Sequence, residues 1–201
     1  MSSTPSQQAA IECDEHLILF AGPGSGKTST CIKKAVRILK DPDRYLILCT
    51  FTVEAANELR TRLARAFEIE GSALPAQRVQ ISTLDSLEQS HLKLFRKVNL
   101  LNPNAQTPML SQMVREHGLP DLKDMSPWIE KYQSALDRDL VRSVLSKEAP
   151  EALQLIDMYT ARLKATGTVD LAIVKRTCAL GLHEGTIPPF QIGGRQITDF
   201  L

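Results

Sequence analysis

The sequence predicts an α/β fold in which a parallel sheet has helices on both faces and is interrupted by an all-helical insert. Two apolar runs without alternation, residues 16–20 (HLILF) and 45–49 (YLILC), have the pattern of strands buried on both faces. A glycine-rich turn and an amphipathic segment at 27–40 lie between these runs. Strand, turn, helix and strand make a βαβ unit, which we expect to be right-handed.

The segments that follow extend this unit and then depart from it. Helical spacing of apolar residues predicts helices over 53–68 and 83–97, with a strand over 78–82 between them. No strand pattern occurs from 98 to 165, where we expect a helix with Ser126 as N-cap and Pro127 at its first position, and another over 148–166. A helix over 169–182, a loop over 184–194 and a strand over 195–201 (RQITDFL) complete the chain. We therefore assign an α/β domain to residues 1–97 and 166–201, and a helical insert subdomain to 98–165.

Composition excludes several classes of protein. The 201 residues carry a net charge of +1, and no apolar run is long enough to span a membrane. The N-terminus lacks the features of a signal peptide, so we expect a cytoplasmic protein. The four cysteines form no C-x-x-C pair, which argues against a zinc site or a disulfide framework. Residues 31–65 hold eight basic and four acidic side chains, a surplus that fits a solvated helix face or a nucleic-acid groove.

Residues 21–28 (AGPGSGKT) carry most of the functional information. They match the phosphate-loop pattern G-x-x-x-x-G-K-[ST] except at the first position, where alanine replaces glycine. Backbone N–H groups at the start of the following helix can form an anion nest, Lys27 can bind the β and γ phosphates, and the Thr28 hydroxyl suits Mg²⁺. The alternative is a glycine turn that only begins a helix. The predicted nucleotide-binding residues of this loop are Ala21, Gly22, Gly24, Ser25, Gly26, Lys27, Thr28 and Ser29, with Lys27 and Thr28 as the candidate catalytic residues.

Three further segments surround the loop in a recognisable order. PSQQAAIE precedes it, LCTFTVEAANELRTRL follows the second strand, and VQISTLDSL follows the next helix. With these motifs the chain resembles the N-terminal part of the first motor domain of UvrD/Rep-like superfamily 1 DNA helicases, over residues 4–95 and more loosely over 165–201. The resemblance implies a RecA-like P-loop NTPase fold, with ATP and Mg²⁺ as cofactors.

The resemblance gives Gln7 a possible role in nucleotide selection. Family members use a glutamine at this place to contact adenine. The residues themselves offer a second role, because Thr4 and Gln7 have the spacing of a capping box at a helix N-terminus. Both roles can coexist.

The resemblance also implies a surface that binds DNA. In the family, the segments after the second and third strands contact single-stranded DNA, and an exposed aromatic ring there can stack on any base. Phe51 could instead be a core ring at the end of a strand. Glu54 and Asp85 replace the lysine and histidine usual in the family, so we expect fewer phosphate contacts, with Asp85 complementing a helix dipole. The expected DNA-binding residues are Thr50, Phe51, Thr52 and Thr83.

Hydrolysis in this family requires a D-E-x-x-D run after a strand like 195–201, and the chain ends at Leu201. Asp199 lies inside that strand and is a poor substitute. We therefore expect the chain to be the N-terminal portion of an ATP-dependent DNA helicase or translocase, a class that includes DNA repair enzymes. We expect this portion to be catalytically incomplete by itself. Its partners would be single-stranded or partly duplex DNA and a second motor domain. The alternatives are another P-loop NTPase, such as a kinase, and a non-catalytic fragment.

Overall fold

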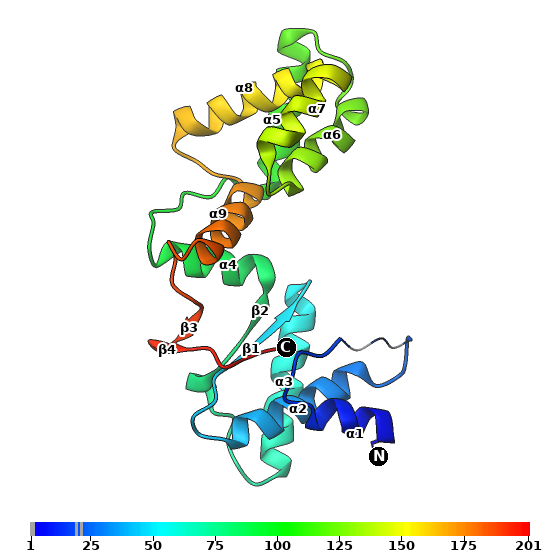
Figure 1. Ribbon diagram of the computed structural model, residues 1–201, viewed down its shortest axis with the longest axis vertical. Coiled ribbons are helices and arrows are strands. Elements are labelled where there is room, and N and C mark those ends of the chain that lie inside the picture. Colours follow the sequence, from blue (N-terminus) through cyan, green and yellow to red (C-terminus); the bar gives the residue numbers. More distant parts are fainter. Residues whose placement is uncertain (1–2, 19, 21) are drawn as a thin grey trace. The chain divides into compact units, whose positions relative to one another are not determined.

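The computed structural model describes residues 3–18, 20 and 22–201, and these fall into two compact units (Figure 1). The first unit combines Met1–Leu87 with Pro189–Leu201, and the second is Glu88–Pro188. The first is mixed α/β and the second is helical. No helix among the described residues has the length and apolar character needed to cross a lipid bilayer.

The first unit contains a small parallel sheet in the order β2-β1-β5. Leu46 of β1 pairs with Val79 of β2 on one side and with Asp199 of β5 on the other. A two-stranded antiparallel hairpin of β3 and β4 precedes β5, so the predicted strand over 195–201 is divided into two short pieces. The elements are α1 (Pro5–Glu12), α2 (Lys27–Lys40), β1 (Leu46–Thr50), α3 (Val53–Ile69), the short 3-10 helix η1 (Ala76–Arg78), β2 (Val79–Thr83), α4 (Leu84–Lys93, which continues into the second unit), β3 (Gln191–Ile192), β4 (Arg195–Gln196) and β5 (Asp199–Phe200).

Successive side chains of a strand point to opposite faces of the sheet, and one apolar face of this sheet packs against two helices. Leu46 and Leu48 of β1, with Val79 and Ile81 of β2, form one buried cluster with the inner faces of α2 and α3. α2 contributes residues at helical spacing between Ile32 and Leu39, as its sequence pattern predicts. The two helices therefore share one face of the sheet, and helices on the opposite face stay a prediction.

The predicted strand over 16–20 is wrong for the residues that the structure describes. His16, Leu17, Ile18 and Phe20 belong to no strand, and Leu19 lies outside the described residues. Ile18 is 80% exposed and Phe20 is 90% exposed. An apolar run shows that a segment can be buried on both faces, but a strand also needs a hydrogen-bonding neighbour. No described strand pairs with this run.

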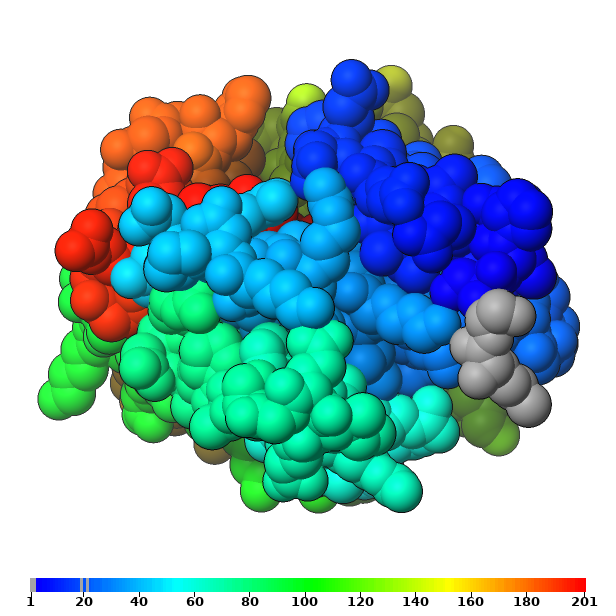
Figure 2. Space-filling view, turned by 90° about the horizontal axis from the view of Figure 1, so that it is seen from below, coloured from blue at the N-terminus to red at the C-terminus, as the bar shows by residue number. Residues whose placement is uncertain are grey.

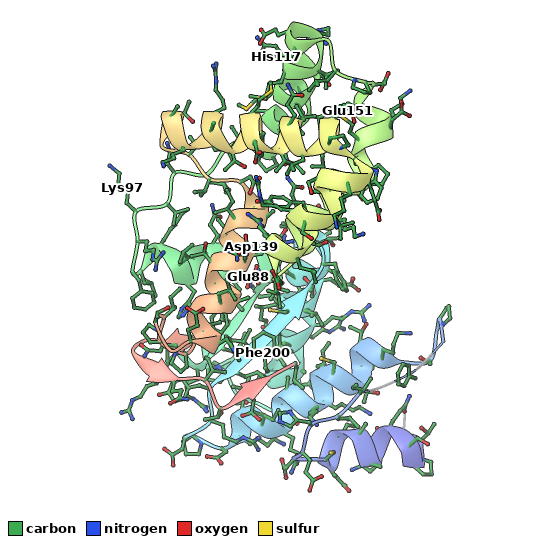
Figure 3. The ribbon with its side chains drawn as sticks, turned by 45° about the horizontal axis from the view of Figure 1, so that its top comes forward. Glu88, Lys97, His117, Asp139, Glu151 and Phe200 are labelled. Carbon is green, nitrogen blue, oxygen red and sulfur yellow. The ribbon has the colours of Figure 1, made fainter. Side chains whose placement is uncertain are left out.

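The second unit is a helical assembly with one large apolar cluster and a smaller one that includes Leu92, Val174 and Ile187. α8 packs against α5, α6 and α7, and its inward face includes Leu155 and Tyr159 (Figure 3, where Glu151 marks its first turn). The predicted N-cap at Ser126 is wrong, because α6 begins earlier, with Asp121 as N-cap, and Pro127 lies inside the helix. The elements are α5 (Pro103–His117), α6 (Leu122–Ser134), α7 (Arg138–Glu148), α8 (Pro150–Thr166) and α9 (Leu171–His183). The domain boundaries assigned from sequence stay a prediction.

Candidate functional site

The glycine-rich loop leads directly into the N-terminus of α2. Gly26 is the N-cap residue, with φ of 81°, and Gly24 has φ of 72°. Both values lie in the left-handed region that favours glycine. A Cβ added at Gly24 would meet no atom within 4 Å, so the backbone there is open to a ligand. Ala21, the atypical first position, lies outside the described residues.

The loop is closed on itself through one carbonyl oxygen. Gly22 O accepts a hydrogen bond from Lys27 Nζ at 2.6 Å and from Ser25 Oγ at 2.7 Å. Lys27 is exposed, as are Ser25 and Ser29, and Thr28 is half-buried in the first turn of the helix. The lysine ammonium group therefore lies over the loop, with a carbonyl oxygen as its acceptor. A phosphate at the N-terminus of α2 would offer the same ammonium a charged acceptor and add the favourable helix dipole.

Gln7 joins α1 to this loop. Its Oε1 accepts from Thr4 N at 2.9 Å, and its own N–H donates to Thr4 Oγ1 at 3.3 Å, which confirms the predicted capping box. In addition, Gln7 Nε2 donates to Ser25 O at 2.9 Å. No sequence pattern indicates this third bond, since it spans 18 residues and ends on a backbone atom. Both polar ends of the side chain are thus engaged within the protein.

A second group of predicted residues lies at the carboxyl ends of the parallel strands. Thr50 and Thr83 are register partners at the ends of β1 and β2. Phe51 and Thr52 follow β1, and Phe51 is 102% exposed, so its alternative role as a core ring is wrong. In sheets of this kind ligands bind at the carboxyl ends of the strands. The four residues that the resemblance singled out are therefore brought to one edge.

Two hydroxyls at this edge, those of Thr52 and Thr83, accept hydrogen bonds from helix N-termini and can still donate one. Thr52 Oγ1 accepts from Ala55 N at 3.1 Å at the start of α3, and Thr83 Oγ1 accepts from Ser86 N at 3.2 Å at the start of α4. A capping hydroxyl accepts with its oxygen, and its O–H can still donate to a ligand oxygen. Glu54 and Asp85 lie in the first turns of the two helices, where a carboxylate complements the dipole. These carboxylates compete with a phosphate for the same helix ends.

Basic side chains of α2 bind α1 and the residues that follow it. Lys34 Nζ donates to Cys13 O at 2.6 Å, and Arg37 forms an ion pair with Asp14 at 2.6 Å. In the space-filling view the dark-blue surface of α1 lies against the blue surface of α2 (Figure 2). The hydrogen bonds from Arg37, and then from Arg44, lower the pKa of Asp14 to about 2. The sequence showed the local basic surplus but not these partners.

The described residues include no group of three or more His, Cys, Asp or Glu side chains that could hold a metal ion. Asp199 forms ion-paired hydrogen bonds with Arg44, so its carboxylate is committed to a structural contact. Thr28 in the first turn of α2 is the residue whose chemistry and position fit Mg²⁺ on a bound nucleotide.

Comparison with known proteins agrees with the motifs. Residues 3–167 match the family described as the UvrD/REP helicase N-terminal domain. An ATP-dependent helicase/nuclease subunit from Latilactobacillus sakei subsp. sakei (strain 23K) is 41% identical over 164 residues, which are 80% of this chain and 16% of that protein.

Two other relatives are also ATP-dependent helicase/nuclease subunits. The protein from Desulforudis audaxviator (strain MP104C) is 45% identical over 74 residues, 33% of this chain and 6% of that protein. The protein from Desulfitobacterium hafniense (strain DSM 10664 / DCB-2) is 39% identical over 101 residues, 46% of this chain and 7% of that protein. The chain thus spans less than a fifth of the length of these relatives. The family match covers more than half of the chain, and we conclude that the chain belongs to the UvrD/REP helicase N-terminal domain family.

Proposed function

We propose that the chain is the ATP-binding and single-stranded-DNA-binding N-terminal portion of a DNA helicase or translocase, with a RecA-like P-loop fold. The observation that carries the proposal is the glycine loop at the N-terminus of α2, with Lys27 folded over it. The names of the relatives, which are ATP-dependent helicase/nuclease subunits, support the same activity for the intact protein. For the intact protein the proposal includes a second motor domain, partly duplex DNA as a further binding partner, and a cytoplasmic location.

The nucleotide would bind through the residues that now bond to one another. In the bound state, backbone N–H groups between Gly24 and Thr28 would donate to a phosphate, and Lys27 would exchange the Gly22 carbonyl for a phosphate oxygen. The Thr28 hydroxyl would hold Mg²⁺, which neutralises phosphate charge when bound. Ser25 and Ser29 add hydroxyls on either side. Gln7 would contact adenine by giving up one of its present bonds.

Single-stranded DNA would lie along the carboxyl ends of β1 and β2. The Phe51 ring projects into solvent, where a base can stack on it, and the hydroxyls of Thr52 and Thr83 can donate to phosphate oxygens. Thr50 donates its own hydroxyl hydrogen to Thr52 O at 2.9 Å, so we assign it to shaping the turn that presents Phe51. Stacking then supplies more of the affinity than ion pairs do.

Binding of a fluorescein-labelled oligothymidylate, followed by anisotropy at fixed low salt, tests the DNA part of this proposal. Phe51→Ala should weaken binding by about 5- to 150-fold, the loss of roughly 1–3 kcal/mol of base stacking. Phe20→Ala is the matched control, since that ring is 90% exposed in the same unit and lies outside the proposed DNA edge. Equal affinity for the wild type and Phe51→Ala would show that DNA does not stack at this edge.

A further inference from the structure

A small cavity in the second unit is lined by side chains from the segment α5 to α9, whose helices are labelled in Figure 1. Its volume is about 20 Å³, and five leucine and isoleucine side chains form its apolar wall. The polar side chains that line it are those of Tyr132, Gln133, Arg138, Tyr159, Thr160 and Asp170. The residues proposed to bind nucleotide and DNA all belong to the first unit, so this cavity is a separate feature.

Two polar atoms of these lining residues are buried without a hydrogen-bond partner among the residues that the structure describes. They are the hydroxyl oxygen of Tyr159, a residue that is 4% exposed, and Nε of Arg138. A buried polar group left unpaired destabilises a fold, so such atoms normally bond to protein or to an internal water. Burial, and next the charge of Asp170, raise the pKa of Tyr159 above its usual range. The Tyr159 hydroxyl therefore keeps its proton and can donate.

Asp170 supplies an acceptor in the same cavity wall. It is 4% exposed, and its Oδ1 accepts a hydrogen bond from Ile173 N at 2.8 Å at the start of α9. Its Oδ2 lies 3.5 Å from Gln133 Nε2, which is longer than an ordinary N–H···O bond of about 2.7–3.2 Å. Burial of a carboxylate costs free energy unless strong hydrogen bonds compensate for it. Asp170 Oδ2 can therefore accept a further hydrogen bond from a molecule in the cavity.

We propose that the cavity binds a single water molecule, which accepts hydrogen bonds from Tyr159 Oη and Arg138 Nε and donates one to Asp170 Oδ2. Internal waters typically make about three hydrogen bonds, the number that these atoms offer. A water needs about 10–15 Å³ of cavity and takes about 30 Å³ in the liquid, so a cavity of 20 Å³ accommodates one water and not two. This water joins the first turn of α7, the interior of α8 and the N-cap of α9.

The charges around the cavity disfavour an ion as its occupant. Arg138 is protonated and its N–H groups can only donate, so a cation would lie against a positive group. The carboxylate of Asp170 repels an anion in the same way. A direct hydrogen bond from Tyr159 to Asp170 would use the same atoms without a ligand, but it would leave Arg138 Nε unpaired. A neutral molecule that both accepts and donates satisfies all three atoms, and water fits the volume.

Oxygen-17 magnetic relaxation dispersion of the whole chain tests the proposal, because it counts long-lived internal waters and is insensitive to the exchange of hydroxyl hydrogens. Tyr159→Phe removes one of the three bonds, so the number of long-lived waters should fall by one. Tyr132→Phe is the matched control, since it removes the hydroxyl of another buried tyrosine in the cavity wall, one that interacts with Arg142. This control should leave the number unchanged. An unchanged number in Tyr159→Phe, or an equal fall in both variants, would overturn the proposal.

A crystal structure of the wild-type chain gives a second readout that does not depend on the folding of a variant. We expect one water within hydrogen-bond distance of Tyr159 Oη, Arg138 Nε and Asp170 Oδ2. A direct bond from Tyr159 to Asp170 without a water, or an ion at this position, would contradict the proposal. Thermal unfolding checks the sign of the effect: Tyr159→Phe should lower the Tm, because it removes a hydroxyl that is bonded to water. A higher Tm, which is expected when an unpaired buried hydroxyl is removed, would also contradict it.

Discussion

Replacement of Gln7 separates its structural role from the proposed contact with adenine. Gln7→Ala removes the capping-box acceptor for Thr4 N and the donor to Ser25 O together. Gln7→Glu keeps an acceptor at the capping position and removes only the donor, because glutamate also completes a capping box. Gln8→Ala is the control, since Gln8 lies next to Gln7 on α1 and bonds only locally, to Glu12 at 2.5 Å.

The expected size of the effect follows from the bonds that are lost. Each exposed hydrogen bond contributes about 0.5–1.5 kcal/mol, so Gln7→Ala should lower the free energy of unfolding by about 1–2 kcal/mol. For a chain of this length that corresponds to a fall in Tm of about 2–8 °C. Gln7→Glu should show about half of this loss. Gln8→Ala should cost only about 0.2–0.5 kcal/mol.

Thermal unfolding followed by circular dichroism, combined with titrations of ATP and GTP, makes the comparison. If Gln7 contacts adenine, both Gln7 variants should lose the preference for ATP over GTP, while Gln8→Ala keeps it. If Gln7 acts only on the loop and the cap, affinity for the two nucleotides should fall equally. An unchanged Tm and unchanged nucleotide binding in Gln7→Ala would refute both roles.

Other substitutions test separate parts of the structure. Gly26→Ala should destabilise the first unit by about 1–2 kcal/mol, because Gly26 has positive φ and a Cβ there would lie 2.9 Å from Gln7 Nε2. Denaturant unfolding measures this loss. A variant as stable as the wild type would contradict the loop geometry. Leu145→Ala should cost about 2–5 kcal/mol, since Leu145 is completely buried in the second unit, and a loss below about 1 kcal/mol would show that its packing is wrong. Because the folded pKa of Asp14 is about 2, its ion pairs stabilise the protein above about pH 4 and are lost as pH falls toward 2. Asp14→Asn should therefore be less stable than wild type at pH 6 and close to it at pH 2, and a stability difference independent of pH would exclude this linkage.

Local patterns in the sequence predicted most of the first unit. The helices α2 and α3 and the strands β1 and β2 follow from apolar spacing, because each buries a face that its own residues define. The capping box at Thr4 and Gln7 was likewise predicted from spacing alone. The family resemblance singled out Thr50 and Thr83, and the structure brings them to one edge because parallel neighbours end together.

The errors arise where structure depends on residues far apart in the chain. The run at 16–18 has the same composition as β1, but pairing requires a neighbouring strand that composition does not reveal. Pro127 suggested a helix start, yet Asp121 caps α6 first, and a buried apolar face holds the helix together past the proline. The bond from Gln7 to Ser25 and the ion pairs of Arg44 could not be predicted, since they depend on the tertiary fold.

The proposed function depends most directly on whether the glycine loop binds nucleotide. Addition of ATP with Mg²⁺ to the ¹⁵N-labelled chain should produce saturable shifts concentrated in the backbone amides of Gly24, Gly26, Lys27 and Thr28. Lys27→Ala should abolish these shifts, and Lys33→Ala, a change on the same helix outside the loop, should preserve them. Shifts that are absent, scattered over the chain or unchanged in Lys27→Ala would contradict the account.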